Sequence, residues 1–95
     1  MRTPKLTAEQ IQRALPDLPG WTYAEKSLRK TYTFADFAAS LAFVNRVGTK
    51  AEAADHHPDI NIRYSKVTLM LSTHDSGGVT EKDLDLAREA DHETS

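Results

Sequence analysis

Hydrophobic and polar positions alternate along four segments of the chain, and this two-residue period predicts strands. The clearest alternation lies at 28–33 and 67–72, where one side of each strand is apolar and the other polar. A third alternation covers 60–64, and Trp21 with Tyr23 opens a fourth strand. The links at 24–27 and near Ser65 are short enough for hairpins, so we expect neighbouring strands to pair antiparallel.

Three other segments have helical spacing. The first follows a capping box at Thr7–Gln10, in which the threonine and the glutamine bind each other's backbone N–H groups. The second is predicted from about Phe34 to about Asp55, with the acid Asp36 in its first turn. The third starts at Thr80, and its polar end at 91–95 is expected to fray.

The resulting order is helix, strand, strand, helix, strand, strand, helix. One apolar face on the sheet requires a covering layer. The sequence therefore predicts a two-layer α+β fold, with a four-stranded antiparallel sheet covered on one face by about three helices. The 95 residues are enough for one such domain, spanning 1–95.

The composition removes several classes of function. There is no cysteine, which excludes disulfides, thiol nucleophiles and cysteine-ligated zinc. The formal net charge of −2 gives no basis for nucleic-acid binding. The first ten residues lack the apolar run of a signal peptide, and no stretch reaches the roughly 20 apolar residues of a membrane span. We expect a soluble, cytoplasmic protein.

Pairing of exposed sheet edges across a two-fold axis would make it a homodimer or homotetramer.

Three of the four histidines are expected to meet in the fold. His56 and His57 follow the second helix, and Pro58 disfavours helical angles at the residue before it. The break lets the two adjacent rings turn toward one cleft. A hairpin centred on the third strand's end returns the end of the fourth strand to the start of the third, which brings His74 beside them.

Such a cluster suits acid–base catalysis. Imidazole gives and takes protons near neutral pH, and loss of water needs an acid at one atom and a base at its neighbour. Glu52 and Asp55 are expected to support the histidines by charge or hydrogen bonding. Because Glu52 and His56 are four residues apart, they are predicted to share a helix face.

Other interpretations of these residues stand beside this one. A histidine pair before a proline can cap a helix end, where the helix dipole favours imidazolium. Three histidines and a carboxylate can also bind Zn²⁺ or Fe²⁺, although adjacent histidines rarely share one ion. Taken alone, Asp83 favours the dipole of the last helix and Tyr64 is a packed strand aromatic, while His92 lies in the polar tail.

The spacing of these residues resembles the signature of the pterin-4a-carbinolamine dehydratases. From Glu52 the chain has Glu-x-x-x-His-His-Pro, and Tyr64, His74 and Asp83 follow at the family's intervals. Further segments are similar to the family's opening turn, last hairpin and last helix: 15–21, 66–69, 72–75 and 78–84.

The resemblance implies dehydration of 4a-hydroxytetrahydropterin to the quinonoid dihydropterin, which recycles the cofactor of aromatic amino-acid hydroxylases. It implies a dimer or a dimer of dimers, no metal, and no cofactor other than the pterin, which is the substrate. It assigns acid–base roles to three histidines and puts two acids at or behind the pterin: His56, His57, His74, Glu52 and Asp83.

One departure concerns the third strand. Animal members have large aromatic residues where this chain has Ile60 and Asn61, which weakens the case for a tetramer.

The alternative function is a non-catalytic module of the same fold that binds a pterin or a protein.

Overall fold

The protein is described from a computed structural model, which covers residues 3–94. Its elements are three α-helices, four strands and two short 3₁₀ helices, in this order: α1 (Ala8–Ala14), η1 (Leu15–Asp17), β1 (Thr22–Ala24), β2 (Ser27–Thr33), α2 (Phe37–Ala54), β3 (Asp59–Arg63), β4 (Lys66–Leu71), η2 (His74–Ser76) and α3 (Glu81–His92).

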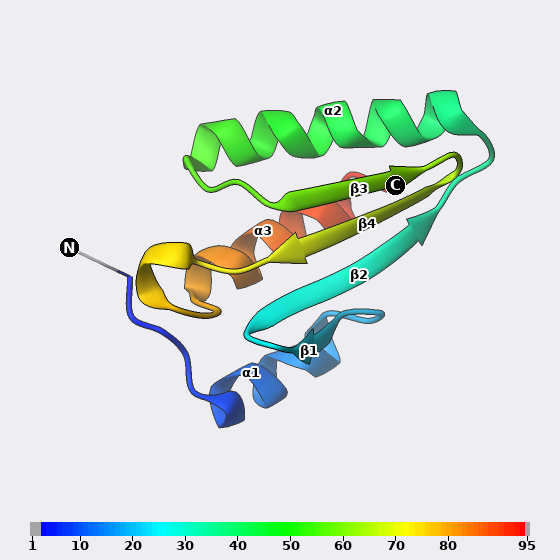
Figure 1. Cartoon of the computed structure of the whole chain (residues 1–95). Coiled ribbons are helices and arrows are strands. Elements are labelled where there is room, and N and C mark those ends of the chain that lie inside the picture. The colour runs from blue at the N-terminus through cyan, green and yellow to red at the C-terminus, as the bar shows by residue number, and fades with distance from the viewer. Residues whose placement is uncertain (1–2, 95) are drawn as a thin grey trace.

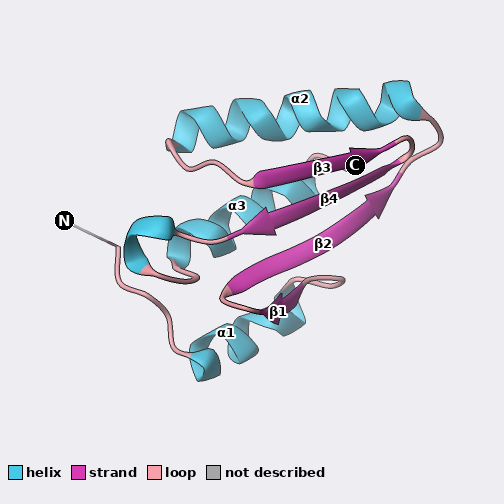
Figure 2. Ribbon diagram, in the orientation of Figure 1, coloured by secondary structure: helices cyan, strands magenta, loops and turns pink. Residues whose placement is uncertain are grey.

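The strands form one antiparallel sheet in the order β1-β2-β4-β3. The three helices cover one face, with α3 behind the middle of the sheet and α2 and α1 to either side (Figures 1 and 2). The predicted two-layer α+β fold is therefore confirmed.

The alternation along the strands explains this layering. Leu28 and Tyr32 pair with Leu71 and Val67, and all four side chains are buried on the helix side. The opposite face carries polar pairs such as Thr31 with Thr68. Burial of the apolar face supplies most of the driving force for packing the helices. The helices contribute these core side chains: Ile11, Phe43, Val47, Ala51, Leu84, Leu86, Ala87 and Ala90.

The second helix begins three residues later than its sequence pattern predicts. Asp36 is its N-cap, where the side chain accepts the backbone N–H of Ala39 at 2.8 Å. Phe34 lies before the helix, and its ring packs 5.0 Å from that of Phe43, measured between centroids. Phe34 therefore makes a core contact from the segment before α2 instead of forming part of the helix's first turn.

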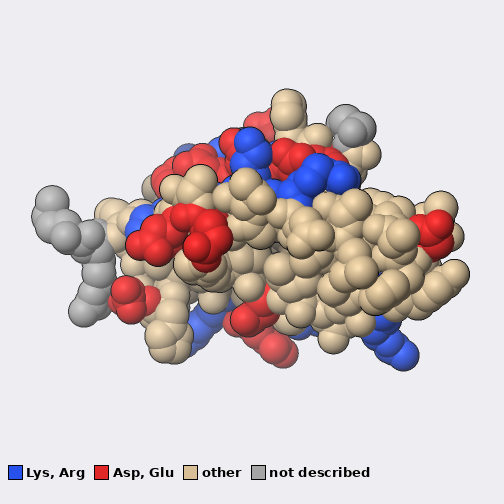
Figure 3. All heavy atoms as spheres, turned by 90° about the horizontal axis from the view of Figure 1, so that it is seen from above, with Lys and Arg blue, Asp and Glu red and all other residues tan. Residues whose placement is uncertain are grey.

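The outward side of α2 carries large apolar groups. Phe37 and Leu41 lie one turn apart and are 46% and 40% exposed. Figure 3 looks onto this side of the molecule and shows a broad area without charged residues, bordered by acidic and basic groups. In residues 3–94, no helix is long and apolar enough to cross a membrane.

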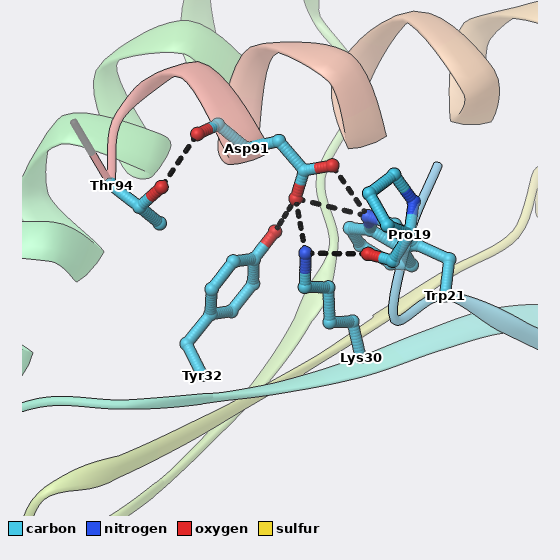
Figure 4. A network of polar contacts seen from close by, with 6 residues as sticks. All are labelled: Pro19, Trp21, Lys30, Tyr32, Asp91 and Thr94. Atoms are coloured by element: carbon cyan, nitrogen blue, oxygen red, sulfur yellow. Dashed lines mark hydrogen bonds and ion pairs between the residues drawn. The ribbon is translucent and has the colours of Figure 1, made fainter. Parts of the chain in front are cut away.

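The prediction that 91–95 frays is wrong for the described part of this segment. α3 continues to His92, and the Asp91 carboxylate accepts hydrogen bonds from three side chains (Figure 4). The Tyr32 hydroxyl and the Lys30 ammonium donate to Oδ1 at 2.5 and 2.9 Å, and the Trp21 indole N–H lies 3.1 Å from the same oxygen. Burial, reinforced by the bond to Asp91, raises the pKa of Tyr32, so its hydroxyl remains a donor. The network fastens the end of α3 to β2 and to the segment before β1.

Candidate active site

The segments that carry the histidines meet at one end of the molecule. There the last turn of α2 lies near the start of β3, the end of β4 and η2 (left in Figure 1). The β3–β4 register, in which Asp59 pairs with Met70, brings the end of one strand beside the start of the other. His56, His57 and His74 line one hollow of about 260 Å³ there. The expected meeting of the three histidines is thus observed.

The end of α2 determines where the two adjacent histidines point. Asp55 is its C-cap and has the left-handed φ of 51°, while its N–H donates to the carbonyls of Ala51 and Glu52. The His56 N–H also donates to the Ala51 carbonyl, at 3.1 Å. Because the chain unwinds here, His56 turns inward toward α3, whereas His57 stays exposed. Asp55 lines the hollow as well.

His56 is held by a fully buried carboxylate. Its Nε2 lies 2.5 Å from Oδ1 of Asp83, whose side chain has no exposed surface. Oδ2 of Asp83 accepts the Thr80 backbone N–H and the Thr73 hydroxyl, each at 2.9 Å. Asp83 also lies in the first turn of α3, where it forms a capping box with Thr80. The same carboxylate also holds the ring of His56 in place. An interpretation of Asp83 as a helix cap alone does not account for this contact.

The hydrogen bonds around Asp83 show how the buried polar groups behind His56 are satisfied. Thr73 uses its proton toward Asp83, so the Thr80 hydroxyl must donate to Thr73, 2.7 Å away. As a carboxylate Asp83 only accepts, which makes Nε2 of His56 the donor in their contact. In residues 3–94 every buried side-chain nitrogen and oxygen has a hydrogen-bond partner. Nδ1 of His56 has no such partner among these residues, so it is not a buried atom. Nδ1 is accordingly open to the hollow.

The second carboxylate, Glu52, pairs with His57. Oε1 of Glu52 lies 2.5 Å from Nε2 of His57, and the two side chains are 78% and 56% exposed. The prediction that Glu52 and His56 share a helix face is wrong, because α2 ends at Ala54, before His56.

His74 lies just beyond β4. The strand ends at Leu71 rather than near His74, and a bridge between Thr73 and Gly78 closes the loop that contains η2. Gly77 ends η2 with a left-handed φ of 74°, which glycine adopts without strain. His74 is exposed, and within residues 3–94 its side chain makes no ion pair or hydrogen bond. The site thus combines two carboxylate-paired imidazoles with one unpaired imidazole.

Several residues of this end were not predicted from sequence. Ser72, Thr73, Asp75 and Lys82 also line the hollow. The only available signal was the T-x-x-D capping box of α3, which places an acid near the hollow but does not reveal that Thr73 binds it.

Tyr64 is absent from the site. It occupies the β3–β4 turn at the opposite end of the hairpin, has a positive φ of 53° and is 67% exposed. The interpretation of Tyr64 as a packed strand aromatic is therefore wrong, because the chain has already left the strand there.

A larger hollow, of about 400 Å³, lies between α2 and α3. Its walls are mainly Ala53, Ala54 and Leu86, and its rim includes Lys50 and Glu89, which form an ion pair at 3.6 Å. This hollow has no histidine, so size alone does not identify the reactive site. Within residues 3–94, no three histidine or acidic side chains are arranged to hold a metal ion.

This α+β fold gathers imidazoles and carboxylates, the groups that acid–base chemistry uses, at one hollow. The family model described as pterin 4 alpha carbinolamine dehydratase matches residues 4–93. A protein of Acidobacterium capsulatum, named as a candidate pterin-4-alpha-carbinolamine dehydratase, is 51% identical over 83 residues, which are 87% of this chain and 90% of that protein. A protein of Roseiflexus sp. with the same name is 51% identical over 87 residues, or 92% and 94% of the two chains.

Two solved structures are similar to this chain as well. The transcriptional coactivator/pterin dehydratase of Brucella melitensis superposes with a TM-score of 0.92 at 31% identity, over 96% of this chain and 99% of that one. A pterin dehydratase-like protein described as a RuBisCO assembly factor of the alpha-carboxysome shares the fold, with a TM-score of 0.65 at 22% identity, over 79% and 87% of the two chains. The chain belongs to the pterin-4a-carbinolamine dehydratase family.

Replacing Asp83 with asparagine should lower both activity and stability. An amide places an NH₂ group either against the Thr80 N–H or against Nε2 of His56, and the second arrangement forces the wrong tautomer. Loss of a supporting partner of this kind costs about 10–100-fold in activity, and an unsatisfied buried group costs about 1–3 kcal/mol of stability. Turnover and urea unfolding of Asp83→Asn measure the two effects. Asp85→Asn, an exposed change on the same helix, is the matched control and should alter neither.

Proposed function

We propose that this protein dehydrates 4a-hydroxytetrahydropterin to the quinonoid dihydropterin by histidine acid–base catalysis. The observation that carries the proposal is the convergence of His56, His57 and His74 on one hollow, in a chain of the carbinolamine dehydratase family. The pterin is the substrate, and no cofactor is required. In a cell this step would recycle the pterin used by an aromatic amino-acid hydroxylase.

The reaction needs two coordinated proton transfers. A protonated imidazole gives its proton to the 4a-hydroxyl, and the C4a–O bond breaks as water leaves. A neutral imidazole takes the proton from N5, and the N5–H electron pair forms the C4a=N5 double bond. The acid has lost one proton and the base has gained one, so exchange between the two, directly or through water, restores the enzyme.

The environments of the three imidazoles support a division of roles. His56 presents Nδ1 from a fixed ring, because Asp83 holds Nε2. Nε2 of His57 lies 2.5 Å from the Glu52 carboxylate, which orients the ring, and we assign His57 the role of the acid. His74, without a partner among residues 3–94, can rotate to exchange protons with water.

The test is the decay of freshly generated carbinolamine, followed by absorbance with and without the protein. Catalysed decay at substoichiometric protein supports the proposal. The alternative is a binding module, as the name of the RuBisCO assembly factor illustrates for a protein of the same fold. Pterin binding without faster decay would favour that alternative.

Activity should survive exhaustive chelation. The adjacent histidines are oriented to different carboxylates, His56 to Asp83 and His57 to Glu52, and the proposed steps move only protons. Metal analysis and turnover should be measured on the same dialysed sample. Stoichiometric metal whose removal abolishes turnover would contradict this expectation.

We also propose self-association into a homodimer or homotetramer. β3 is an edge strand with unpaired backbone groups along one side, which invite strand pairing. The exposed Phe37 and Leu41 offer a second, apolar surface. Sedimentation at micromolar concentration should give a dimer or larger species, and a monomer alone would contradict the expectation. Leu41→Glu tests whether the α2 surface takes part.

A further inference from the structure

Of the three histidines at the hollow, His74 has no side-chain partner to orient it. Asp83 and Glu52 hold the rings of His56 and His57, whereas within residues 3–94 no hydrogen bond or ion pair holds the ring of His74. The direction of this ring therefore depends on the backbone of η2, which begins at His74.

The 3₁₀ helix η2 is a single turn in a loop that contains two glycines. Its N-cap, Thr73, gives it no side-chain hydrogen bond, and Gly77 and Gly78 follow it. Glycine loses more backbone freedom on folding than any other residue, so contacts from outside help to order such a loop. The hydrogen bonds that close the loop join Thr73 to Gly78, at 2.8 and 3.4 Å, and do not include the η2 residues.

Contacts from outside come from residues 3–6, which we call the N-terminal strap. The Ser76 hydroxyl donates a hydrogen bond to the Thr3 carbonyl, and within residues 3–94 this is the only side-chain hydrogen bond of η2. The Leu6 N–H donates to the Val79 carbonyl at 2.8 Å. Figure 1 shows the strap beside the loop that contains η2. The loop is thereby held both at η2 and just after its glycine pair.

Packing and sequence reinforce the strap. A methyl group at Gly78 would lie 2.8 Å from Cδ and 3.2 Å from Cγ of Lys5, so the strap and the loop are in close contact. Leu6 packs against the hydrophobic core. Pro4 has a fixed φ and favours extended angles at Thr3 before it. The strap is therefore preorganised as an extended segment, in which no helix uses the Thr3 carbonyl.

We infer that Ser76 is a positioning residue, which directs His74 at the hollow through its bond to the N-terminal strap. The inference rests on the proposed function. Without this bond η2 populates other arrangements, and turnover falls with the fraction of molecules in which His74 is in place. One hydrogen bond changes such an equilibrium by roughly threefold to tenfold. Because His74 is proposed to move protons rather than to hold the pterin, the loss should appear in kcat and not in KM.

The test measures kcat and KM for Ser76→Ala in the parent and in the His74→Ala variant, which keeps two of the three histidines. In the parent kcat should fall roughly threefold to tenfold at nearly unchanged KM. In the His74→Ala background the same change should alter kcat by less than about twofold, because the ring that it positions is absent. Ser76→Thr keeps the hydroxyl and should retain most of the parent rate.

A second variant weakens the strap without changing η2. Pro4→Gly gives the detached strap more conformational freedom, so that docking it costs more entropy. In the parent kcat should fall roughly twofold to fivefold, and the loss should again disappear in the His74→Ala background. If Ser76→Ala does not fold, which circular dichroism will show, the result for Pro4→Gly decides the question.

The matched control is Ser40→Ala, which should leave kcat unchanged. It also removes a serine hydroxyl bound to a backbone carbonyl, that of Asp36 at 3.1 Å, but at the start of α2, away from the histidines. Equal fold losses with and without His74, or an unchanged kcat in the parent, would overturn the inference, although the dehydratase proposal would stand. If the parent does not accelerate carbinolamine decay, the proposed function fails, and this inference fails with it.

Discussion

Replacing both His57 and His74 with alanine should bring carbinolamine decay close to its uncatalysed rate. The two rings share two hollows, and removing both leaves only the largely buried His56 there. His57→Ala alone should cost about 10²–10⁴-fold, the usual effect of losing one acid–base group. The single loss should be partial, because His56 and His74 remain to transfer protons.

Circular dichroism must show that these variants fold, which the exposure of both side chains leads us to expect. The control is His92→Ala, an exposed histidine at the end of α3, far along the chain from the hollow. It should keep the parent rate. A folded double variant that turns over like the parent would show that the histidines are not the catalytic groups.

The largest loss of stability is expected for Asp91→Ala. This change leaves the Trp21 indole N–H and the Tyr32 hydroxyl without their acceptor inside the fold, and it removes the ion-pair partner of Lys30. Unsatisfied buried donors cost about 1–3 kcal/mol each. The Asp91 side chain is 24% exposed, so water offsets part of this and we expect about 2–4 kcal/mol in total. For a chain of this size the melting temperature should fall by about 10–25 °C.

A double-mutant cycle separates this network from general damage to α3. In the Asp91→Ala background, Tyr32→Phe should cost much less than it does in the parent, because the hydroxyl has already lost its acceptor. Equal costs in both backgrounds would show that the network contributes no coupling energy. Glu89→Ala, an exposed change on the same helix, should have little effect.

The arrangement of the site follows from patterns that the sequence displays. Alternation defines the β3–β4 hairpin, and an antiparallel hairpin must return its last residues to its first. This is why His74 could be placed beside His57 in advance. Such topological arguments tolerate errors of one or two residues at the ends of elements.

The pairing of individual side chains depends on details that the patterns do not contain. Glu52 contacts His57 rather than His56 because α2 unwinds at Asp55, and a shift of one residue rotates a helical side chain by about 100°. Asp91 belongs to a polar tail by composition alone. Its role depends on Trp21, Lys30 and Tyr32, which lie 59 to 70 residues earlier in the chain and give no local signal of where they converge.

The most direct test of the proposed function is the decay rate of carbinolamine generated in the cuvette, measured at increasing concentrations of the parent protein and of the His57→Ala/His74→Ala variant. We predict a rate that rises in proportion to the parent protein and stays near the uncatalysed value with the variant. Decay that is independent of the parent protein would contradict the assignment of dehydratase activity to this site.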